Sequence, residues 1–259
     1  MDPVVDFATR LAQKAGGFLR QNFNTRGIQA YVKTDRSAVT DIDLATDRLI
    51  AEEIKQNFPN EGFLSEEISP TYTSESPAAW VIDPLDGTTN YALGLPFWGV
   101  SIARLQDGYP DLAGIYFPPL DEMYVAQRNQ GAFLNGERIQ VKPPLKAQPF
   151  SFFSCCSRTH RLYTIHVPYK SRILGSAAYS LCSLGKGMAV LAFEATAKIW
   201  DIAGAWLVVT EAGGIIGTLD GSQPFPLIPG TDYSTKDFPI LGAATASLAA
   251  RARQQILPK

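Results

Sequence analysis

The stretch from Trp80 to Tyr91 reads WVIDPLDGTTNY, and it decides how the rest of the chain is interpreted. An apolar run typical of a buried strand delivers Asp83 at its end, and Asp86 follows after a turn that Pro84 stiffens. Two carboxylates that leave one tight turn can point into the same space, where they repel each other unless one is protonated or a cation lies between them. Because only oxygen ligands are on offer, the pattern favours Mg²⁺ over Zn²⁺.

The residues after Asp86 suit an anion. Gly87 permits close approach of a ligand to the backbone, and the amides of Gly87, Thr88 and Thr89 can surround a phosphate. The Thr88 hydroxyl can orient a water molecule beside the metal. An ordinary surface turn has the same local sequence pattern, so acids elsewhere in the chain must decide between the two interpretations.

Two further acidic elements support a metal site. Glu66 and Glu67 end a short predicted strand, Gly62–Glu67, and Asp201 begins a strongly apolar helix. An Asp at a helix start is ordinarily a cap. This one precedes an otherwise uncharged helix, so we expect it at the wall of the core. Glu66, Asp83, Asp86 and Asp201 together predict a site for two or three metals, of the kind that performs in-line displacement at phosphorus.

The remaining sequence predicts a mixed α+β or α/β fold. A chain of 259 residues with 46% hydrophobic residues forms one large domain or two small ones. The proline-rich segment Pro143–Pro149 is the predicted boundary. It separates an N-terminal α+β subdomain, residues 1–145 with most metal ligands, from a C-terminal α/β subdomain, residues 146–259 with Asp201 and the substrate contacts. Helices are predicted at Met1–Phe23, Thr40–Phe58, Ser176–Leu191 and Trp200–Ala212, and strands at Gly62–Glu67, Ala79–Asp83, Gly99–Leu105, Asp111–Phe117, Met123–Gln127, Ala132–Leu134, Ser151–Ser154, Arg172–Leu174 and Ala192–Thr196.

Charge is unevenly distributed along the chain. Between Arg138 and Phe193 there are eight basic residues and no acid, whereas the remainder holds 15 basic and 25 acidic residues. This pattern indicates either a surface for solubility and subunit contact or a basic rim that draws an anion towards an acidic centre. Scattered basic residues and an isoelectric point near 5.7 argue against a nucleic-acid partner.

The sequence favours a cytoplasmic protein. The apolar stretches are shorter than the roughly 18–20 residues that a membrane span needs. Met1–Phe23 has the spacing of an amphipathic helix and lacks the basic start of a signal peptide. The three cysteines, too few for a disulfide framework, suit a reducing compartment.

The motifs taken together resemble the inositol monophosphatase family of Mg²⁺-dependent, lithium-sensitive phosphomonoesterases. The first signature is Trp80–Tyr91 and the second is Trp200–Gly214, WDIAGAWLVVTEAGG. The pattern of Lys33, Val39-Thr40 and Asp43 and the GFLSEE element also match, so the resemblance runs nearly end to end. It implies a layered αβαβα sugar-phosphatase fold with two subdomains, and a homodimer.

The resemblance also implies a role for each matched residue. Glu66, Asp83 and the main-chain carbonyl of Leu85 would hold a first Mg²⁺. Asp83, Asp86 and Asp201 would hold a second, and Glu66 with waters a third. Glu66 and Thr88 would position the attacking water, with Asp43 hydrogen-bonded to Thr88. The substrate would contact Asp86, Gly87, Thr88, Gly175, Ser176, Ala177, Glu194 and Asp201.

The expected substrate is a small anionic phosphorylated polyol or sugar. Thr89-Asn90-Tyr91 resembles the inositol phosphate and fructose bisphosphate branch, because enzymes for histidinol phosphate and 3′-phosphoadenosine 5′-phosphate usually carry Lys at the first of these positions. Glu194 favours a polyol, since a carboxylate accepts hydrogen bonds from hydroxyl groups. We therefore expect hydrolysis of myo-inositol 1-phosphate, with fructose 1,6-bisphosphate as the second candidate. Lys170, Arg172 and Lys198 leave room for a second phosphate; animal members carry His at the position of Lys198.

Two other functions stay open from the sequence: a regulatory protein that kept the fold without the activity, and a two-metal nuclease. Other polar residues receive no catalytic role. Asp47 is predicted to be an exposed acid of the second helix, His160 and His166 surface residues, and Glu211 structural. Lys33 and Asp35 are predicted to lie in a loop before the second helix, where the resemblance implies a segment that closes over the metals.

Overall fold

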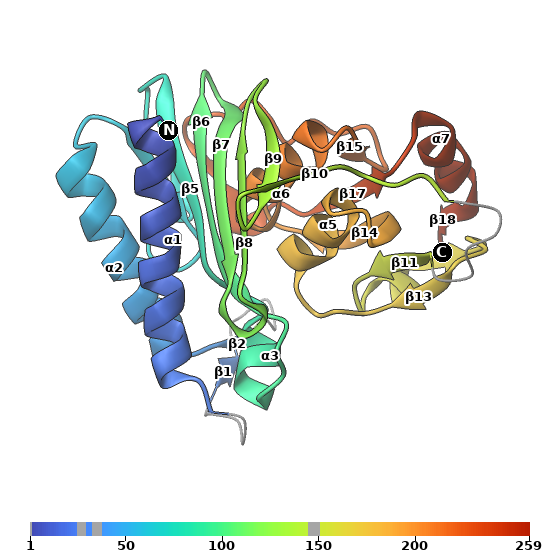
Figure 1. Ribbon diagram of the computed structural model, residues 1–259, viewed down its shortest axis with the longest axis horizontal. Helices are drawn as coiled ribbons and strands as arrows, with labels where there is room; N and C mark the ends of the chain where they lie inside the picture. The colour runs from blue at the N-terminus through green and yellow to red at the C-terminus, as the bar shows by residue number, and fades with distance from the viewer. Residues whose placement is uncertain (1, 25–29, 33–37, 145–150) are drawn as a thin grey trace.

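The computed structural model describes residues 2–24, 30–32, 38–144 and 151–259. They form five layers in the order helices, sheet, helices, sheet, helix, as Figure 1 shows. This layering confirms the predicted αβαβα architecture. Lys33 and Asp35 lie outside the described residues, as does most of the predicted boundary segment Pro143–Pro149.

The first layer consists of α1 (Pro3–Asn22) and α2 (Asp41–Asn57), which confirm the first two predicted helices. Thr40 is the N-cap of α2: it and Asp43 form a reciprocal capping box, in which each side chain accepts from the other's backbone N–H. The small pair β1 (Tyr31–Val32) and β2 (Ala38–Val39) lies between the two helices in the chain. The capping box fixes the orientation of Asp43 at the start of α2.

The second layer is a seven-stranded sheet in the order β10-β9-β8-β7-β6-β5-β3. All its pairs are antiparallel except β3 with β5. Asn135 and Gly136 both have positive φ and form the hairpin turn between β9 and β10. The strands are β3 (Gly62–Ser65), β5 (Ala78–Asp86), β6 (Gly99–Gln106), β7 (Tyr109–Phe117), β8 (Glu122–Gln127), β9 (Gly131–Leu134) and β10 (Glu137–Ile139).

Alternation along β5 determines which side chains face which layer. Trp80 and Ile82 pack in the core under α1 and α2, whereas Val81 packs in the core on the opposite face. Asp83 follows with the same parity as Val81, so its carboxyl group faces the central helices. In the neighbouring parallel strand β3, Leu64 packs in that same central core. Glu66 lies two residues after Leu64, so its side chain faces the same side of the sheet.

The third layer consists of α5 (Ala177–Gly185) and α6 (Ile199–Glu211). They pack on each other and between the two sheets. The predicted helix Ser176–Leu191 is wrong in its second half: α5 ends at Gly185, and β14 begins at Ala189. Gly187, with φ of +74°, breaks the helix, and the apolar run beyond it belongs to a buried strand.

The fourth layer is a five-stranded sheet in the order β13-β11-β14-β17-β15, and α7 (Ala246–Gln255) covers its outer face as the fifth layer. Parallel pairing joins β13, β11 and β14; antiparallel pairing joins β14, β17 and β15. These strands are β11 (Phe152–Cys155), β13 (Lys170–Arg172), β14 (Ala189–Ala197), β15 (Ile215–Thr218) and β17 (Phe238–Ala243).

Short elements complete the chain. The two-residue strand β4 (Thr71–Tyr72) pairs with β16 (Thr231–Asp232). The other short elements are α3 (Thr88–Leu93), α4 (Thr159–Leu162), η1 (Pro118–Leu120), β12 (Tyr163–Ile165), η2 (Tyr233–Thr235) and β18 (Ile256–Pro258). Among the helices described, none is long and apolar enough to cross a membrane.

Candidate functional site

A cavity of about 800 Å³ is lined by residues of both halves of the chain. Its volume is in the range of small-molecule sites. Asp43 lies behind the cavity wall; all the other predicted site residues line the cavity, namely Glu66, Asp83, Leu85, Asp86, Gly87, Thr88, Gly175, Ser176, Ala177, Glu194 and Asp201. The structure therefore brings the predicted residues to one place.

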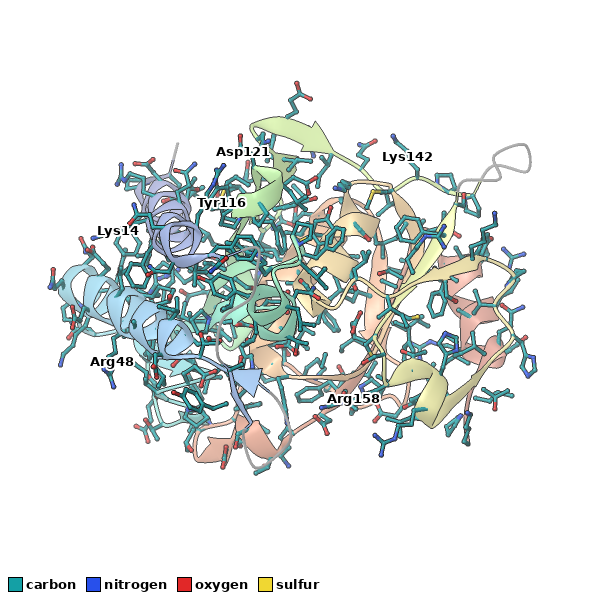
Figure 2. The ribbon with its side chains drawn as sticks, turned by 90° about the horizontal axis from the view of Figure 1, so that it is seen from below. Lys14, Arg48, Tyr116, Asp121, Lys142 and Arg158 are labelled. Carbon is teal, nitrogen blue, oxygen red and sulfur yellow. The ribbon has the colours of Figure 1, made fainter. Side chains whose placement is uncertain are left out.

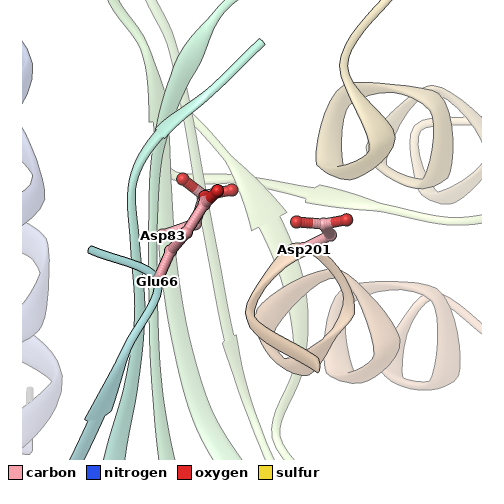
Figure 3. A group of neighbouring side chains, drawn as sticks. All are labelled: Glu66, Asp83 and Asp201. Atoms are coloured by element: carbon pink, nitrogen blue, oxygen red, sulfur yellow. The ribbon is translucent and has the colours of Figure 1, made fainter. Parts of the chain in front are cut away.

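Glu66, Asp83 and Asp201 form a carboxylate triad on this wall. One oxygen of each lies within 4.8 Å of the other two. Figure 3 shows Glu66 and Asp83 side by side at the ends of their strands, with Asp201 facing them from the first turn of α6. Parallel pairing places β3 and β5 in register, so that Ser65 is opposite Ile82 and both acids emerge at the same sheet edge. The pairing of the two strands is therefore enough to bring both carboxyl groups to the cavity.

Burial and nearby acids make Asp83 and Asp201 costly to ionise. Asp83 is buried, and desolvation, followed by the charges of Glu66, Asp86 and Asp201, raises the pKa of its carboxyl group well above the usual range. The pKa of Asp201 is raised in the same way, by burial and then by its acidic neighbours. A divalent cation between these oxygens would remove the repulsion.

Asp201 also acts as a helix cap. Its Oδ2 atom accepts the backbone N–H of Lys198 at 2.8 Å, which fixes the carboxyl group against the start of α6. The Asp201 side chain therefore has two roles in the structure. Its Oδ2 atom caps the start of α6, and its carboxyl group belongs to the acidic cluster.

Asp86 is bound differently from the triad. Its oxygens accept the hydroxyl of Ser176 and the backbone N–H groups of Ala177, at 3.1 Å, and Ala178, at 3.0 Å. Asp86 thus joins the end of β5 to the N-terminus of α5, where a negative charge is favoured. Burial, opposed by these hydrogen bonds, raises the pKa of its carboxyl group to about 6.

Thr88 and Asp43 form a hydrogen-bonded pair at the cavity wall. The Thr88 hydroxyl lies 2.9 Å from Asp43 Oδ1 and 3.0 Å from the main-chain carbonyl of Leu85, and it can donate to either. Asp43 Oδ2 accepts the backbone N–H of Thr40 at 2.9 Å and also its hydroxyl. Burial raises the pKa of Asp43 to about 6. Asp43 therefore contacts Thr88 and does not itself line the cavity.

Gly87 supplies the turn that places Thr88. Its φ is +92°, in the left-handed region that favours glycine. A Cβ atom here would lie 2.6 Å from the carbonyl oxygen of Phe97. The turn leads directly into α3, and both Gly87 and Thr88 line the cavity.

The prediction for Asp47 is wrong. Its side chain is fully buried, and its Oδ2 atom accepts the N–H groups of Glu67 and Ile68, each at 3.1 Å. It holds the turn that follows Glu66. The available signal was its spacing from Asp43, because residues four apart share one face of a helix. Both acids are buried on that face, behind the wall of the cavity.

Glu194 lies on β14 at the cavity wall. It is 4% exposed, and its Oε1 atom has no hydrogen-bond partner within the described parts of the chain. Burial raises the pKa of its carboxyl group to about 8. A buried, unpaired oxygen on a cavity wall costs free energy unless a ligand satisfies it.

The positions of the basic residues differ most from those expected from the sequence. Lys170 and Arg172 are exposed on the edge strand β13 and do not line the cavity. Lys198 lines it, but its ammonium group contacts the carbonyl oxygen of Ser234 at 2.5 Å and Asp237 at 3.1 Å. Arg158, which the sequence analysis did not single out, also lines the cavity. Its position just after β11, inside the acid-free stretch, was the signal that could have found it.

The donor set at the triad fits a hard divalent cation. It offers carboxylate oxygens from Glu66, Asp83 and Asp201 at mutual distances that one ion can span, together with the nearby carbonyl of Leu85. No cysteine or histidine belongs to the group in the part of the chain described. Oxygen ligands of this kind suit hard cations, whereas sulfur and imidazole ligands suit softer ones.

Known proteins match this chain over most of its length. The profile of the inositol monophosphatase family matches residues 1–257. Nus factor SuhB of Pasteurella multocida is 33% identical over 237 residues, which cover 87% of this chain and 88% of that protein.

Two solved structures also match over nearly the whole length. The IMPase of Thermotoga maritima superimposes with a TM-score of 0.78 at 27% identity, over 98% of this chain and 97% of that one. Extragenic suppressor protein SuhB of Bartonella henselae gives a TM-score of 0.79 at 26% identity, with 97% of each chain covered. The chain, by its full-length match as well as its fold, belongs to the inositol monophosphatase family.

Proposed function

We propose that this protein is a Mg²⁺-dependent phosphomonoesterase that hydrolyses a small polyol phosphate, with myo-inositol 1-phosphate as the first candidate. The observation that carries the proposal is the carboxylate triad of Glu66, Asp83 and Asp201, placed on the same cavity wall as the Thr88 hydroxyl. Family membership supports the reaction class.

The proposed metal ligands are those implied by the sequence. Glu66, Asp83 and the Leu85 carbonyl would hold one Mg²⁺, and Asp83, Asp86 and Asp201 a second; a third would rest on Glu66. Bound Mg²⁺ polarises the phosphate and makes water a better nucleophile. The triad geometry supports Glu66, Asp83 and Asp201 most directly. Asp86 has one oxygen, Oδ1, that accepts a single hydrogen bond and so retains a lone pair for a cation.

Thr88 and Glu66 would position the attacking water. When the Thr88 hydroxyl donates to Asp43 Oδ1, its oxygen faces the cavity as an acceptor. A water molecule that donates one hydrogen to Thr88 and the other to Glu66 has a lone pair directed at phosphorus. Asp43 keeps the Thr88 hydroxyl in this orientation and is therefore a positioning residue.

The other side chains at the cavity would bind the substrate. Gly87 and Thr88 line the cavity, so their backbone amides would donate to a phosphate, and Glu194 would offer its unpaired oxygen to substrate hydroxyl groups. Asp86 joins Ser176 and Ala177 to the acidic cluster, so the segment Gly175–Ala177 would contact the polyol next to the metals. These contacts favour a polyhydroxylated ligand over a flat aromatic one.

The proposal includes the organisation expected from the sequence. The seven-stranded sheet belongs to residues before 145 and the five-stranded sheet to residues after 150, which supports subdomains 1–145 and 146–259. We also propose that the protein is a homodimer, because of the family resemblance, and that it is cytoplasmic, because of the sequence pattern.

A panel of phosphate-release assays tests the function. Inositol 1-phosphate, fructose 1,6-bisphosphate, histidinol phosphate and 3′-phosphoadenosine 5′-phosphate are each incubated with Mg²⁺, with and without lithium. We expect the highest kcat/KM for inositol 1-phosphate and loss of that activity in lithium. Faster release from histidinol phosphate would contradict the substrate assignment from Thr89–Tyr91.

A second candidate is a regulatory role without catalysis, which the name of the relative, Nus factor SuhB, favours. Retention of all the predicted carboxylates at one cavity argues for a working metal site instead. Calorimetric titration with Mg²⁺ separates the two. Binding at millimolar Mg²⁺ together with phosphate release supports the phosphatase; absence of both supports the regulatory role.

A further inference from the structure

The turn that follows β3 carries Glu66 of the triad, and its backbone is held from two directions. The Glu66 N–H donates to the carbonyl of Ile82 on β5 at 3.3 Å. The next two N–H groups, those of Glu67 and Ile68, both donate to the Oδ2 atom of Asp47, each at 3.1 Å. The first contact comes from the sheet, whereas the other two come from a single side chain of α2.

Asp47 is fully buried and lies 20 residues before Glu67 in the chain. Its neighbour Arg48 is exposed, and Figure 2 shows Arg48 on the outer side of α2. A buried polar oxygen costs free energy unless it accepts hydrogen bonds, and successive N–H groups of a turn can hold an anionic oxygen. The contact therefore satisfies the Oδ2 atom of Asp47 and two donors of the acidic turn at once.

The same face of α2 also contacts the hydroxyl group that would position the attacking water. Asp43 lies one turn before Asp47, and its Oδ1 atom is 2.9 Å from the Thr88 hydroxyl oxygen. Side chains four residues apart are neighbours on a helix surface. The first two turns of α2 therefore contact both segments from which Glu66 and Thr88 would act on one water molecule.

We propose that Asp47 is a positioning residue for Glu66: it fixes the turn that follows Glu66 and so holds the Glu66 carboxyl group at the triad, in a set place relative to Thr88. This inference rests on the proposed metal-dependent function and adds a residue to which that function gave no role. Because Asp47 acts through two N–H groups, it supplies a hydrogen-bond acceptor rather than a charge. Groups that orient a metal ligand from behind it typically change metal affinity by about 10- to 100-fold.

Calorimetric titration with Mg²⁺ measures this role. Asp47→Ala removes the acceptor, so we expect Mg²⁺ to bind about tenfold more weakly than to the unaltered protein. Asp47→Asn keeps a carbonyl oxygen at the same place and should bind Mg²⁺ within about twofold of the unaltered protein. Asp47→Leu removes the acceptor but fills the space, and it takes the place of Asp47→Ala if that variant does not fold.

The matched control is Thr46→Ala. Thr46 is adjacent to Asp47 on α2 and equally buried, and its hydroxyl donates to the carbonyl of Ile42, 2.7 Å away in the same helix. The substitution removes a hydrogen bond that lies within α2, so we expect unchanged affinity for Mg²⁺. Thermal unfolding checks that each variant is folded. A loss of affinity in Thr46→Ala as large as that in Asp47→Ala would reflect general loosening of α2 and would overturn the inference.

Hydrogen exchange in the metal-free protein reports on the turn itself. In EDTA we expect the amide protons of Glu67 and Ile68 to exchange at least about tenfold faster in Asp47→Ala and at the original rate in Asp47→Asn. Faster exchange with unchanged affinity for Mg²⁺ would mean that the turn does not set the place of Glu66. That result would overturn the inference, as would weak Mg²⁺ binding by Asp47→Asn.

Phosphate release from inositol 1-phosphate separates this inference from the proposed function. If the unaltered protein releases no phosphate but binds Mg²⁺ more tightly than Asp47→Ala does, the phosphatase is refuted and the role of Asp47 stands. If the unaltered protein releases phosphate and all variants bind Mg²⁺ equally, the role of Asp47 alone is refuted. Absence of Mg²⁺ binding by the unaltered protein would refute both.

Discussion

Replacing Asp83 by Asn should stabilise the metal-free protein and abolish its response to Mg²⁺. Asp83 is buried, and one of its oxygens lies within 4.8 Å of an oxygen of both Glu66 and Asp201. Two unit charges at that separation repel each other by about 3.5 kcal/mol at an effective dielectric of about 20. The amide of Asn has the same shape and keeps the hydrogen bond from the Leu85 N–H, now 2.9 Å from Asp83 Oδ1. The substitution therefore removes charge without leaving a cavity.

The gain in stability should depend on pH. Burial and the neighbouring acids raise the pKa of the Asp83 carboxyl group. For an acid whose pKa is raised by folding, the stabilising contribution is complete below the pKa of the unfolded chain and is lost as the pH rises through the folded value. In EDTA we thus expect little difference between Asp83→Asn and the unaltered protein at pH 4 and about 1–3 kcal/mol in favour of the variant at pH 8.

Thermal unfolding with and without Mg²⁺ measures both effects. For a chain of this size, each kcal/mol corresponds to about 2–4 °C in Tm. The unaltered protein should gain stability from Mg²⁺, by about 2.7 kcal/mol at 100 times Kd, and Asp83→Asn should gain none. Asp47→Asn is the control, because it neutralises an equally buried acid outside the triad and should keep the response. A less stable Asp83→Asn in EDTA at pH 8, or an undiminished response to Mg²⁺, would refute the reasoning.

Three further perturbations test separate parts of the site. Thr88→Ala should lower kcat by about 100-fold or more, because the attacking water loses a hydrogen-bond acceptor. The Mg²⁺ concentration that gives the half-maximal rate should not change. Steady-state rates over a series of Mg²⁺ concentrations check this, and a large change in that concentration would make Thr88 structural. Gly87→Ala should lower the free energy of unfolding, measured in urea, by at least about 1–2 kcal/mol, since φ is +92° and the new Cβ would lie 2.6 Å from a backbone oxygen. An unchanged midpoint of unfolding would mean that the turn relaxes freely. Glu194, whose pKa is raised to about 8, should make stability fall as the pH rises from about 5 to 9, by at most about 1.4 kcal/mol per unit, and Glu194→Gln should remove that fall. A fall of the same size in the variant would assign the titration to other groups.

The acidic wall of the cavity was predictable because its residues sit at the ends of apolar elements. Asp83 and Glu66 each follow an apolar strand, and Asp201 opens an apolar helix, so a local pattern was enough to find them. Parallel pairing of β3 and β5 then follows from the requirement that both carboxyl groups reach one edge. The helix that Thr40 caps was likewise encoded locally, by a capping box.

Other features depend on contacts between distant segments, which periodicity does not show. Asp47 is buried because the turn after Glu66 lies against α2, and a polar residue on a helix carries no mark of such a partner. The overlong helix prediction at Ser176–Leu191 arose because a continuous apolar run suits a buried strand as well as a helix. The order of the five-stranded sheet, in which β17 lies between β14 and β15, comes from long-range pairing alone.

The triad is divided between the two halves of the chain, and this makes metal binding a reporter of their assembly. Glu66 and Asp83 come from the seven-stranded sheet, whereas Asp201 comes from α6, which is encoded beyond residue 150 but packs on that sheet. A fragment that ended near residue 145 would keep two ligands and expose the apolar sheet face that α6 covers. Mg²⁺ would then bind tightly only after both fragments were mixed, so the metal would act as the complementation signal of a split protein.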